Sequence, residues 1–171
     1  SFSEKTSIVV PSSDMPRIAV LPFDDMSAGT DKGYLSDAIA EGIITELARS
    51  KTYAVIARNS SFRYRDQPVD IRQIGQELGV DYLLEGSQQK IEDRLKVTAQ
   101  LLNAHDGSHV WANTYNRPIG DLFVAQEEII RRLLTDDTIS LVDRVSGLLV
   151  GCYGQLPARL VRLPIDAITI A

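Results

Sequence analysis

Cysteine is nearly absent from this sequence, which holds Cys152 as its one thiol among 171 residues. A single cysteine cannot form an intramolecular disulfide, so a fold that depends on disulfide bonds is excluded. This usage suits a reducing compartment, and we expect the chain to be cytoplasmic. Because no histidine lies near Cys152 in the sequence, the thiol is also a weak candidate for a catalytic nucleophile.

Long apolar runs and leader sequences are also missing. No run reaches the ~18 apolar residues that a membrane-spanning helix requires, and the N-terminus lacks the basic, then apolar, pattern of a signal peptide. The opening stretch "SFSEKTSIVVPSSDMP" is rich in serine and proline and has no period, which indicates a linker over residues 1–16. We therefore expect no membrane partner, and we interpret the chain as one module of a longer polypeptide.

Positive charge is the scarcer sign. The 18 lysines and arginines are outnumbered by 23 aspartates and glutamates, which gives a net charge of −5 and a pI of about 5.0. Domains that bind nucleic acid usually carry a net basic face, so this balance argues against a nucleic-acid partner. The length itself suggests one domain with tails.

Motifs of well-known catalytic sites are absent too. Neither a P-loop nor GxGxxG occurs, and nothing resembles a nucleophile elbow. The stretch "FDDMSAGT" has a superficial likeness to the metal-binding turn of class III nucleotide cyclases. That turn needs a second carboxylate to hold Mg²⁺, yet no matching second motif follows, and Pro22 interrupts the segment. Asp24 and Asp25 are therefore interpreted as turn residues whose carboxylates bond local N–H groups.

A metal site is suggested only by two histidines. His105 and His109 flank an Asp-Gly turn, and Asp106 lies between them. Histidines at an exposed turn are usually polar surface, and no third strong ligand is evident. We expect no metal, no cofactor and no catalytic residue in this fragment.

What is present begins with a βαβ pattern. Residues 17–23 form a short apolar run typical of a buried strand. Apolar side chains then recur at helical spacing over residues 34–48, and residues 53–57 form a second apolar run. Strand, helix and strand in this order predict two parallel strands joined by the helix.

A helix with defined ends is predicted over residues 69–79. Asp70 is the expected N-cap, and Gln73 completes a capping-box pattern. Gly79 is expected to end the helix.

The period then falls to two, which predicts a three-stranded antiparallel meander over residues 80–115. Within residues 95–101, apolar positions alternate with Lys96, Thr98 and Gln100, as in a strand with one wet face. A helix over residues 121–134 should follow, with Asp121 as N-cap, and a further helical pattern runs through residues 139–149.

These elements predict an α/β (α+β) fold. Its mixed sheet should have about five strands in the order βαβαβββα, with helices on one face and on part of the other. The domain would occupy residues 17–135, followed by a helical extension and tail over residues 136–171.

The stretch "VIARNSSFRYR", residues 55–65, has two interpretations. If it is extended, Phe62 and Tyr64 point the same way and close the end of the core, with Arg63 and Arg65 on the opposite, solvated side. This is the interpretation we favour. The alternative is a site for a nucleotide or another small anion, formed by Arg58, Asn59, Ser60 and Arg63.

Five segments in order carry a family resemblance: "RIAVLPFDDMS", "YLSDAIAEGIITELAR", "VIARNSSFRYRDQPVDIRQIGQELGVDYLLEGS", "LKVTAQLLNAHDGSHVWANTYNR" and "DLFVAQEEI". Over about residues 17–135 the chain resembles the TolB-N-terminal-like domain. That domain occurs in bacterial multidomain proteins beside class III adenylate/guanylate cyclase domains, winged-helix domains and tetratricopeptide repeats. The resemblance implies a mixed α/β fold in a cytoplasmic setting. It implies no catalytic site, because the domain is usually accessory.

Two functions follow as hypotheses. The first is a non-catalytic regulatory or protein-interaction module of a bacterial cyclase-type signalling protein, which contacts neighbouring domains of its own polypeptide. A homodimer is expected in that setting, because class III cyclases build their active sites between two chains. The second is a nucleotide- or anion-binding sensor. Cyclase catalysis by this fragment is the least favoured.

Overall fold

The computed structural model describes residues 15–29, 33–136 and 139. Its helices and strands lie within one compact unit, Pro16–Asp136. In chain order they are β1 (Arg17–Val20), β2 (Asp24–Asp25), α1 (Tyr34–Ser50), β3 (Ala54–Val55), α2 (Arg58–Phe62), α3 (Ile71–Leu78), β4 (Tyr82–Ile91), β5 (Arg94–Asn103), β6 (His109–Pro118), a 3₁₀ turn η1 (Ile119–Asp121) and α4 (Leu122–Thr135).

The strands form one mixed sheet in the order β3-β1-β4-β5-β6, with β2 paired to β4 beyond the end of β1. β1 runs parallel to β3 and β4, which confirms the predicted βαβ unit. β4, β5 and β6 pair antiparallel, which confirms the meander. The α+β fold class is therefore confirmed. The short strand β2 and the short helix α2 are additions that the sequence pattern did not predict.

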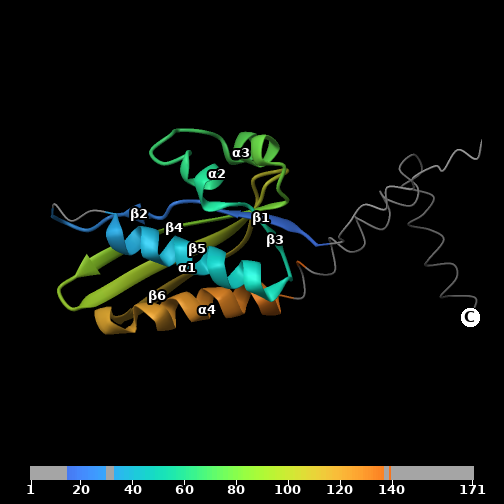
Figure 1. Cartoon of the computed structure of the whole chain (residues 1–171). Coiled ribbons are helices and arrows are strands. Elements are labelled where there is room, and N and C mark those ends of the chain that lie inside the picture. Colours follow the sequence, from blue (N-terminus) through green and yellow to red (C-terminus); the bar gives the residue numbers. More distant parts are fainter. Residues whose placement is uncertain (1–14, 30–32, 137–138, 140–171) are drawn as a thin grey trace, which may run out of the picture. The chain divides into compact units, whose positions relative to one another are not determined.

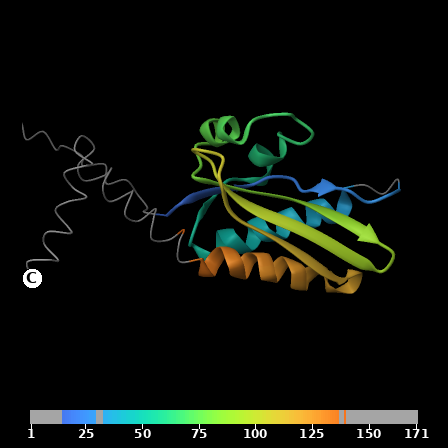
Figure 2. The same cartoon turned by 180° about the vertical axis from the view of Figure 1, so that it is seen from behind.

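Helices cover the two faces of the sheet unequally. α1 and α4 lie side by side along one face, whereas α2 and α3 sit over part of the other (Figures 1 and 2). The core beneath α1 and α4 is made of side chains with at most 1% exposure: Ile18, Ile39, Ile43, Leu47, Leu84, Leu95, Val97, Leu101, Ile129 and Leu133. Each such side chain contributes about 1.5–3 kcal/mol through removal of apolar surface from water. This face therefore holds most of the stabilising burial.

A close approach joins α1 to α4. A Cβ built on Gly42 would lie only 2.3 Å from the Nε2 atom of Gln126, so a side chain at this position would displace Gln126. Glycine thus allows the two helices to pack with the Gln126 side chain between them.

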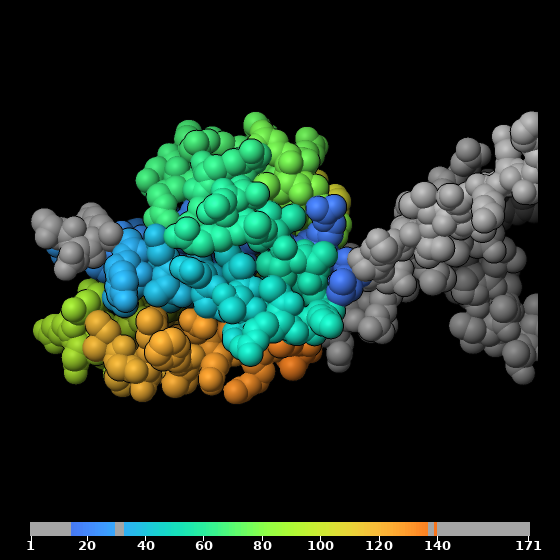
Figure 3. Space-filling view, viewed as in Figure 1, coloured from blue at the N-terminus to red at the C-terminus, as the bar shows by residue number. Residues whose placement is uncertain are grey.

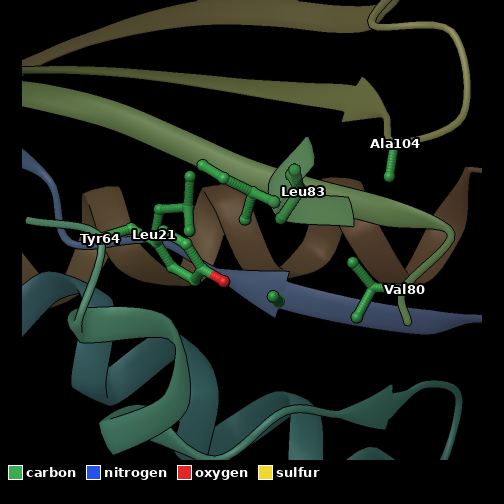
Figure 4. Close-up of a cluster of buried hydrophobic side chains, with 7 residues drawn as sticks. Leu21, Tyr64, Val80, Leu83 and Ala104 are labelled. Atoms are coloured by element: carbon green, nitrogen blue, oxygen red, sulfur yellow. The ribbon is translucent and has the colours of Figure 1, made fainter. Parts of the chain in front are cut away.

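A second apolar cluster lies under α2 and α3 on the opposite face. It contains Ala19, Leu21, Tyr64, Ile74, Val80, Leu83 and Ala104. Figure 4 shows Tyr64 and Leu21 lying against each other near Leu83, with Val80 and Ala104 farther along the strands. This cluster holds α3 and the segment before it on the sheet.

The predicted helix ends are confirmed in part. The Asp70 carboxylate accepts a hydrogen bond of 2.8 Å from the Arg72 N–H, and Gly79 adopts φ 62° at the end of α3. The second half of the predicted capping box was wrong, because the Gln73 amide donates to Glu77 instead. Asp121 lies at the N-cap of α4 but makes no side-chain cap bond. The expected linker and the helical pattern over 139–149 fall almost entirely outside the described residues.

Candidate functional site

The stretch 55–65 is a short helix and a turn, so the extended conformation was wrong. Only Ala54 and Val55 pair in β3, and α2 begins at Arg58. The helical turn separates the two aromatic side chains. Tyr64 enters the apolar cluster with 8% of its surface exposed, as the sequence predicted, whereas Phe62 stays half-buried.

The half-buried Phe62 ring is covered by arginines rather than by the core. The guanidinium carbon of Arg58 lies 4.3 Å from the ring centroid, and that of Arg65 lies 5.4 Å from it. Cation–π contacts at partly exposed positions contribute about 0.5–1 kcal/mol each. The aromatic ring therefore orders two cationic side chains on the surface of α2.

Both arginines also bind acids on α1. Arg65 Nη2 donates a hydrogen bond of 2.5 Å to Asp37 Oδ1, and Arg58 Nη2 lies 3.8 Å from Asp37 Oδ2. Arg58 Nε lies 3.7 Å from Glu41 Oε2, one helical turn along α1. In the space-filling view the α2 segment lies directly against α1 (Figure 3). These ion pairs connect α1, on one face of the sheet, to α2 and the turn after it, on the other.

The third arginine of the stretch belongs to a different network, with Tyr64 and Glu77. Arg63 Nη2 donates to the Tyr64 hydroxyl at 2.6 Å, and that hydroxyl donates to the Glu77 carboxylate. Burial, with the neighbouring carboxylate, raises the pKa of Tyr64. The Tyr64 hydroxyl and the Gln73 amide together lower the pKa of Glu77. The network therefore fixes the turn after α2 against α3.

The four predicted anion-site residues lie on α2 and at its C-cap, but the two cations among them have separate partners. Arg58 faces Asp37 and Glu41, whereas Arg63 faces Glu77. Asn59 and Ser60 are exposed on α2. Nothing in this geometry tests whether an anion binds there, and the site stays a prediction.

A groove of about 670 Å³ lies beside the turn after α2. One wall is the segment from Tyr64 to Val69 with the start of α3, and the other is the uncovered face of β4 and β5 beside the β1–β2 connection. Its sheet wall is polar: Glu85 and Ser87 on β4 lie opposite Gln100 and Thr98 on β5. The alternation of apolar and polar residues over residues 95–101 predicted a solvent-facing side of this strand, and that side forms part of this wall. The other wall could not be anticipated, because it depends on how the turn after α2 folds back.

Charge on the groove is mainly negative. Asp24, Asp66 and Glu85 line it, and Arg65 is its one cationic lining residue. The Arg65 charge is already paired with Asp37, and the Glu85 carboxylate accepts a hydrogen bond from the neutral Gln100 amide. Asp66 has φ 56°, a left-handed backbone conformation that aspartate tolerates better than most residues.

Asp24 and Asp25 pair in strand β2, so the turn interpretation was wrong for the backbone, but the expected bonding of a carboxylate to local N–H groups is confirmed for Asp25. Its carboxylate accepts hydrogen bonds of 2.8 Å from the N–H groups of Ser27 and Gly33, so it organises the connection that leads into α1. Asp24 is exposed at the groove.

The histidine turn has local partners. His105 Nε2 lies 3.2 Å from Asp81 Oδ1, and the Asp106 carboxylate accepts bonds from both the N–H and the hydroxyl of Ser108. Across the described residues, no three His, Cys, Asp or Glu side chains are grouped as a metal site would require.

Trp111 is buried, with 6% exposure, and the guanidinium carbon of Arg132 lies 5.7 Å from its ring centroid. None of the helices described in residues 15–136 is long and apolar enough to cross a membrane.

Sequence comparison places most of this unit in a known family. Residues 13–133 match the second domain of HilA/YgeH-like transcriptional regulators. Over 119 residues the chain is 45% identical to a protein of Rhizobium meliloti (strain 1021) named "Putative adenylate cyclase 3". That match covers 70% of this chain and 20% of the relative, so the chain spans about a fifth of the relative's length.

Solved structures with low sequence identity share the fold. The lipoprotein GNA1162 from Neisseria meningitidis has a TM-score of 0.51 at 14% identity, covering 71% of this chain and 98% of its own. TolB from Acinetobacter baumannii has a TM-score of 0.51 at 19% identity, covering 71% of this chain and 28% of its own. The TolB-like fold implied by the sequence segments is therefore confirmed.

Proposed function

The chain belongs to the HilA/YgeH-like transcriptional regulator second-domain family, and on that premise we propose that it is a non-catalytic regulatory and protein-interaction module of a bacterial cyclase-type signalling protein. The observation that carries the proposal is the 45% identity to a segment that makes up only 20% of a protein named as an adenylate cyclase. Such a segment is an accessory domain of a larger chain. Its partners would be neighbouring domains, whether cyclase, winged-helix or tetratricopeptide-repeat, in the cytoplasm.

Apolar side chains gathered at one end of the domain support an interaction role. Met26, Tyr34, Ile91, Phe123 and Val124 have exposures of 62%, 79%, 53%, 70% and 42%. Met26 follows β2, Tyr34 begins α1, Ile91 ends β4, and Phe123 and Val124 lie in the first turn of α4. These ends of the four elements lie at the same end of the domain (Figures 1 and 2). We name these five residues the apolar end. Concentrated exposed apolar surface is typical of interaction sites.

The occupant we propose for the apolar end is a second copy of the chain. Sedimentation at micromolar concentration should show a dimer, and Phe123→Ser should weaken it. Leu134→Ser is the matched control, because Leu134 is also an exposed apolar residue of α4 but lies near the opposite end of that helix. A monomer at every concentration would remove the dimer from the proposal.

The non-catalytic role is tested in two steps. The isolated chain, incubated with ATP and Mg²⁺ or Mn²⁺, should form no cyclic nucleotide above a buffer control. In the Rhizobium meliloti relative, deleting the matching segment should change cyclic-nucleotide production, and inserting this chain in its place should restore it. Turnover by the isolated chain, or a deletion without effect on production, would contradict the proposal.

A second candidate is a sensor for a nucleotide or another small anion at Arg58, Asn59, Ser60 and Arg63. The exposure of the two cations supports it, because 40% of the Arg58 side chain and 56% of the Arg63 side chain remain accessible to solvent. Their existing carboxylate partners would have to be displaced or shared.

A further inference from the structure

We propose that the groove between the turn after α2 and the uncovered sheet face binds a small ligand that carries an ammonium or guanidinium group on an apolar body. This site lies apart from the apolar end and from the four predicted anion-site residues, none of which lines it. The inference therefore does not depend on the interaction role proposed above.

The size and the mixed lining of the groove suit a small organic molecule. Its volume of about 670 Å³ falls within the roughly 300–1,000 Å³ of typical ligand sites. Pro68, Val69 and Ile71, which are exposed or half-buried, supply apolar surface on the side of the helices. The hydroxyls of Ser87 and Thr98 on the sheet wall supply hydrogen-bonding groups opposite them. An apolar body with one polar group would contact both walls.

The acidic residues that line the groove favour a positively charged group on the ligand. Asp24 and Asp66 have no cationic partner among the described ion pairs, and the hydrogen-bond partner of Glu85 is a neutral amide. Arg65 does not offset them, because its guanidinium is bonded to Asp37 at 2.5 Å. A cationic ligand would gain charge-assisted hydrogen bonds from these carboxylates, whereas a phosphate or carboxylate would be repelled.

The groove is also formed before any ligand arrives. Tyr64 is bonded to Glu77 on α3 and to Arg63, and Arg65 is bonded to Asp37 on α1, so the start of the turn after α2 is held by both helices. A wall that is already ordered loses little conformational entropy on binding, which favours affinity for a small molecule.

Three probes that share a ring and a two-carbon skeleton, but differ in charge, test the proposal. They are 2-phenylethylamine, 2-phenylethanol and phenylacetate, titrated into the ¹⁵N-labelled chain and followed by amide chemical shifts. We expect the amine to bind at least about tenfold more tightly than the alcohol, with shifts at Asp66, Gln67 and Ser87, and phenylacetate and ATP to leave these signals unchanged.

Variants test whether the groove carboxylates cause the preference for the amine. Asp24→Asn with Glu85→Gln should bring the affinities for the amine and the alcohol to within about twofold. Glu127→Gln, an exposed charge change on α4 outside the groove, should keep the wild-type preference. No binding of the amine at millimolar concentration, equal binding of amine and alcohol by the wild type, or binding of phenylacetate or ATP in the groove would overturn the inference. The wild-type probe series decides the outcome even where a variant fails to fold.

Discussion

Asp37 on α1 and Arg65 in the turn after α2 are joined by a hydrogen bond of 2.5 Å, although they lie 28 residues apart in the chain. The same carboxylate also faces Arg58 at 3.8 Å. One aspartate therefore connects the helix layer on one face of the sheet to the segment that forms the groove wall on the other.

Replacing Asp37 should loosen this connection. Asp37→Asn should lower the free energy of unfolding by about 1 kcal/mol, because two guanidinium groups lose their charged partner while solvent screens much of the effect. Urea denaturation measures the change. Glu46→Gln is the matched control: it breaks a more exposed pair, with Arg49 at 3.0 Å, and should cost less than about 0.5 kcal/mol. Equal losses in the two variants would show that Asp37 is an ordinary surface residue.

The two aromatics of the α2 stretch should differ in their contribution to stability. Tyr64→Ala removes a ring that is 8% exposed and should cost about 3–5 kcal/mol. Phe62→Ala should cost roughly 1–2 kcal/mol, since its ring is half-buried and touches the Arg58 and Arg65 guanidinium groups rather than the core. Tyr64→Phe keeps the ring and should cost about 1 kcal/mol through loss of the hydroxyl bonds. Thermal and urea unfolding of all three variants would refute this ranking if Phe62→Ala were the most destabilising.

Acid should weaken the cap of α3. Hydrogen bonds from the Arg72 side chain and N–H lower the pKa of Asp70 from 3.8 to about 2. A folded-state pKa below the unfolded value means that the interaction stabilises the fold above about pH 4 and that this contribution is lost as the pH falls to about 2. The melting temperatures of wild type and Asp70→Asn should therefore differ at pH 5 and converge toward pH 2.

Asp121 provides the comparison for this pH series. It occupies the N-cap of α4 without a side-chain cap bond, so Asp121→Asn should show no such convergence. A gap between wild type and Asp70→Asn that stays constant from pH 5 to pH 2 would argue that the ionised carboxylate does not stabilise α3.

Nucleotides should leave the thermal stability unchanged. Arg58 and Arg63 already face carboxylates on α1 and α3, so an added phosphate would have to compete with them. We expect melting curves without and with ATP, inorganic phosphate or an oligonucleotide to superimpose. A rise in melting temperature with ATP that disappears in Arg63→Ala would instead make the anion-binding sensor the better account.

Local patterns determined much of the fold. The period-two stretch over residues 80–115 specified three strands and a wet face, and both are observed. Asp70 and Gly79 marked the ends of α3 in the sequence. The first N–H groups of any helix require an acceptor such as the Asp70 carboxylate, and a helix commonly ends at a residue in the left-handed conformation, which glycine adopts easily. Such patterns can be recognised in the sequence because the interactions that produce them join residues only a few positions apart.

The groove and the behaviour of the α2 stretch were decided by tertiary structure. Alternating aromatics and arginines in "FRYR" matched a strand, yet Arg58–Phe62 became a helix, where distant acids bind the arginines and only Tyr64 reaches the apolar cluster. The partners that fixed this choice, Asp37, Glu41 and Glu77, lie 13 to 28 residues away from the side chains they bond. The sequence by itself determined which segments are strands and helices. The tertiary structure alone decided which charged side chains pair and which face of the sheet stays open to a ligand. Both depend on packing between segments that are distant in the chain, and a local sequence pattern holds no information about such packing.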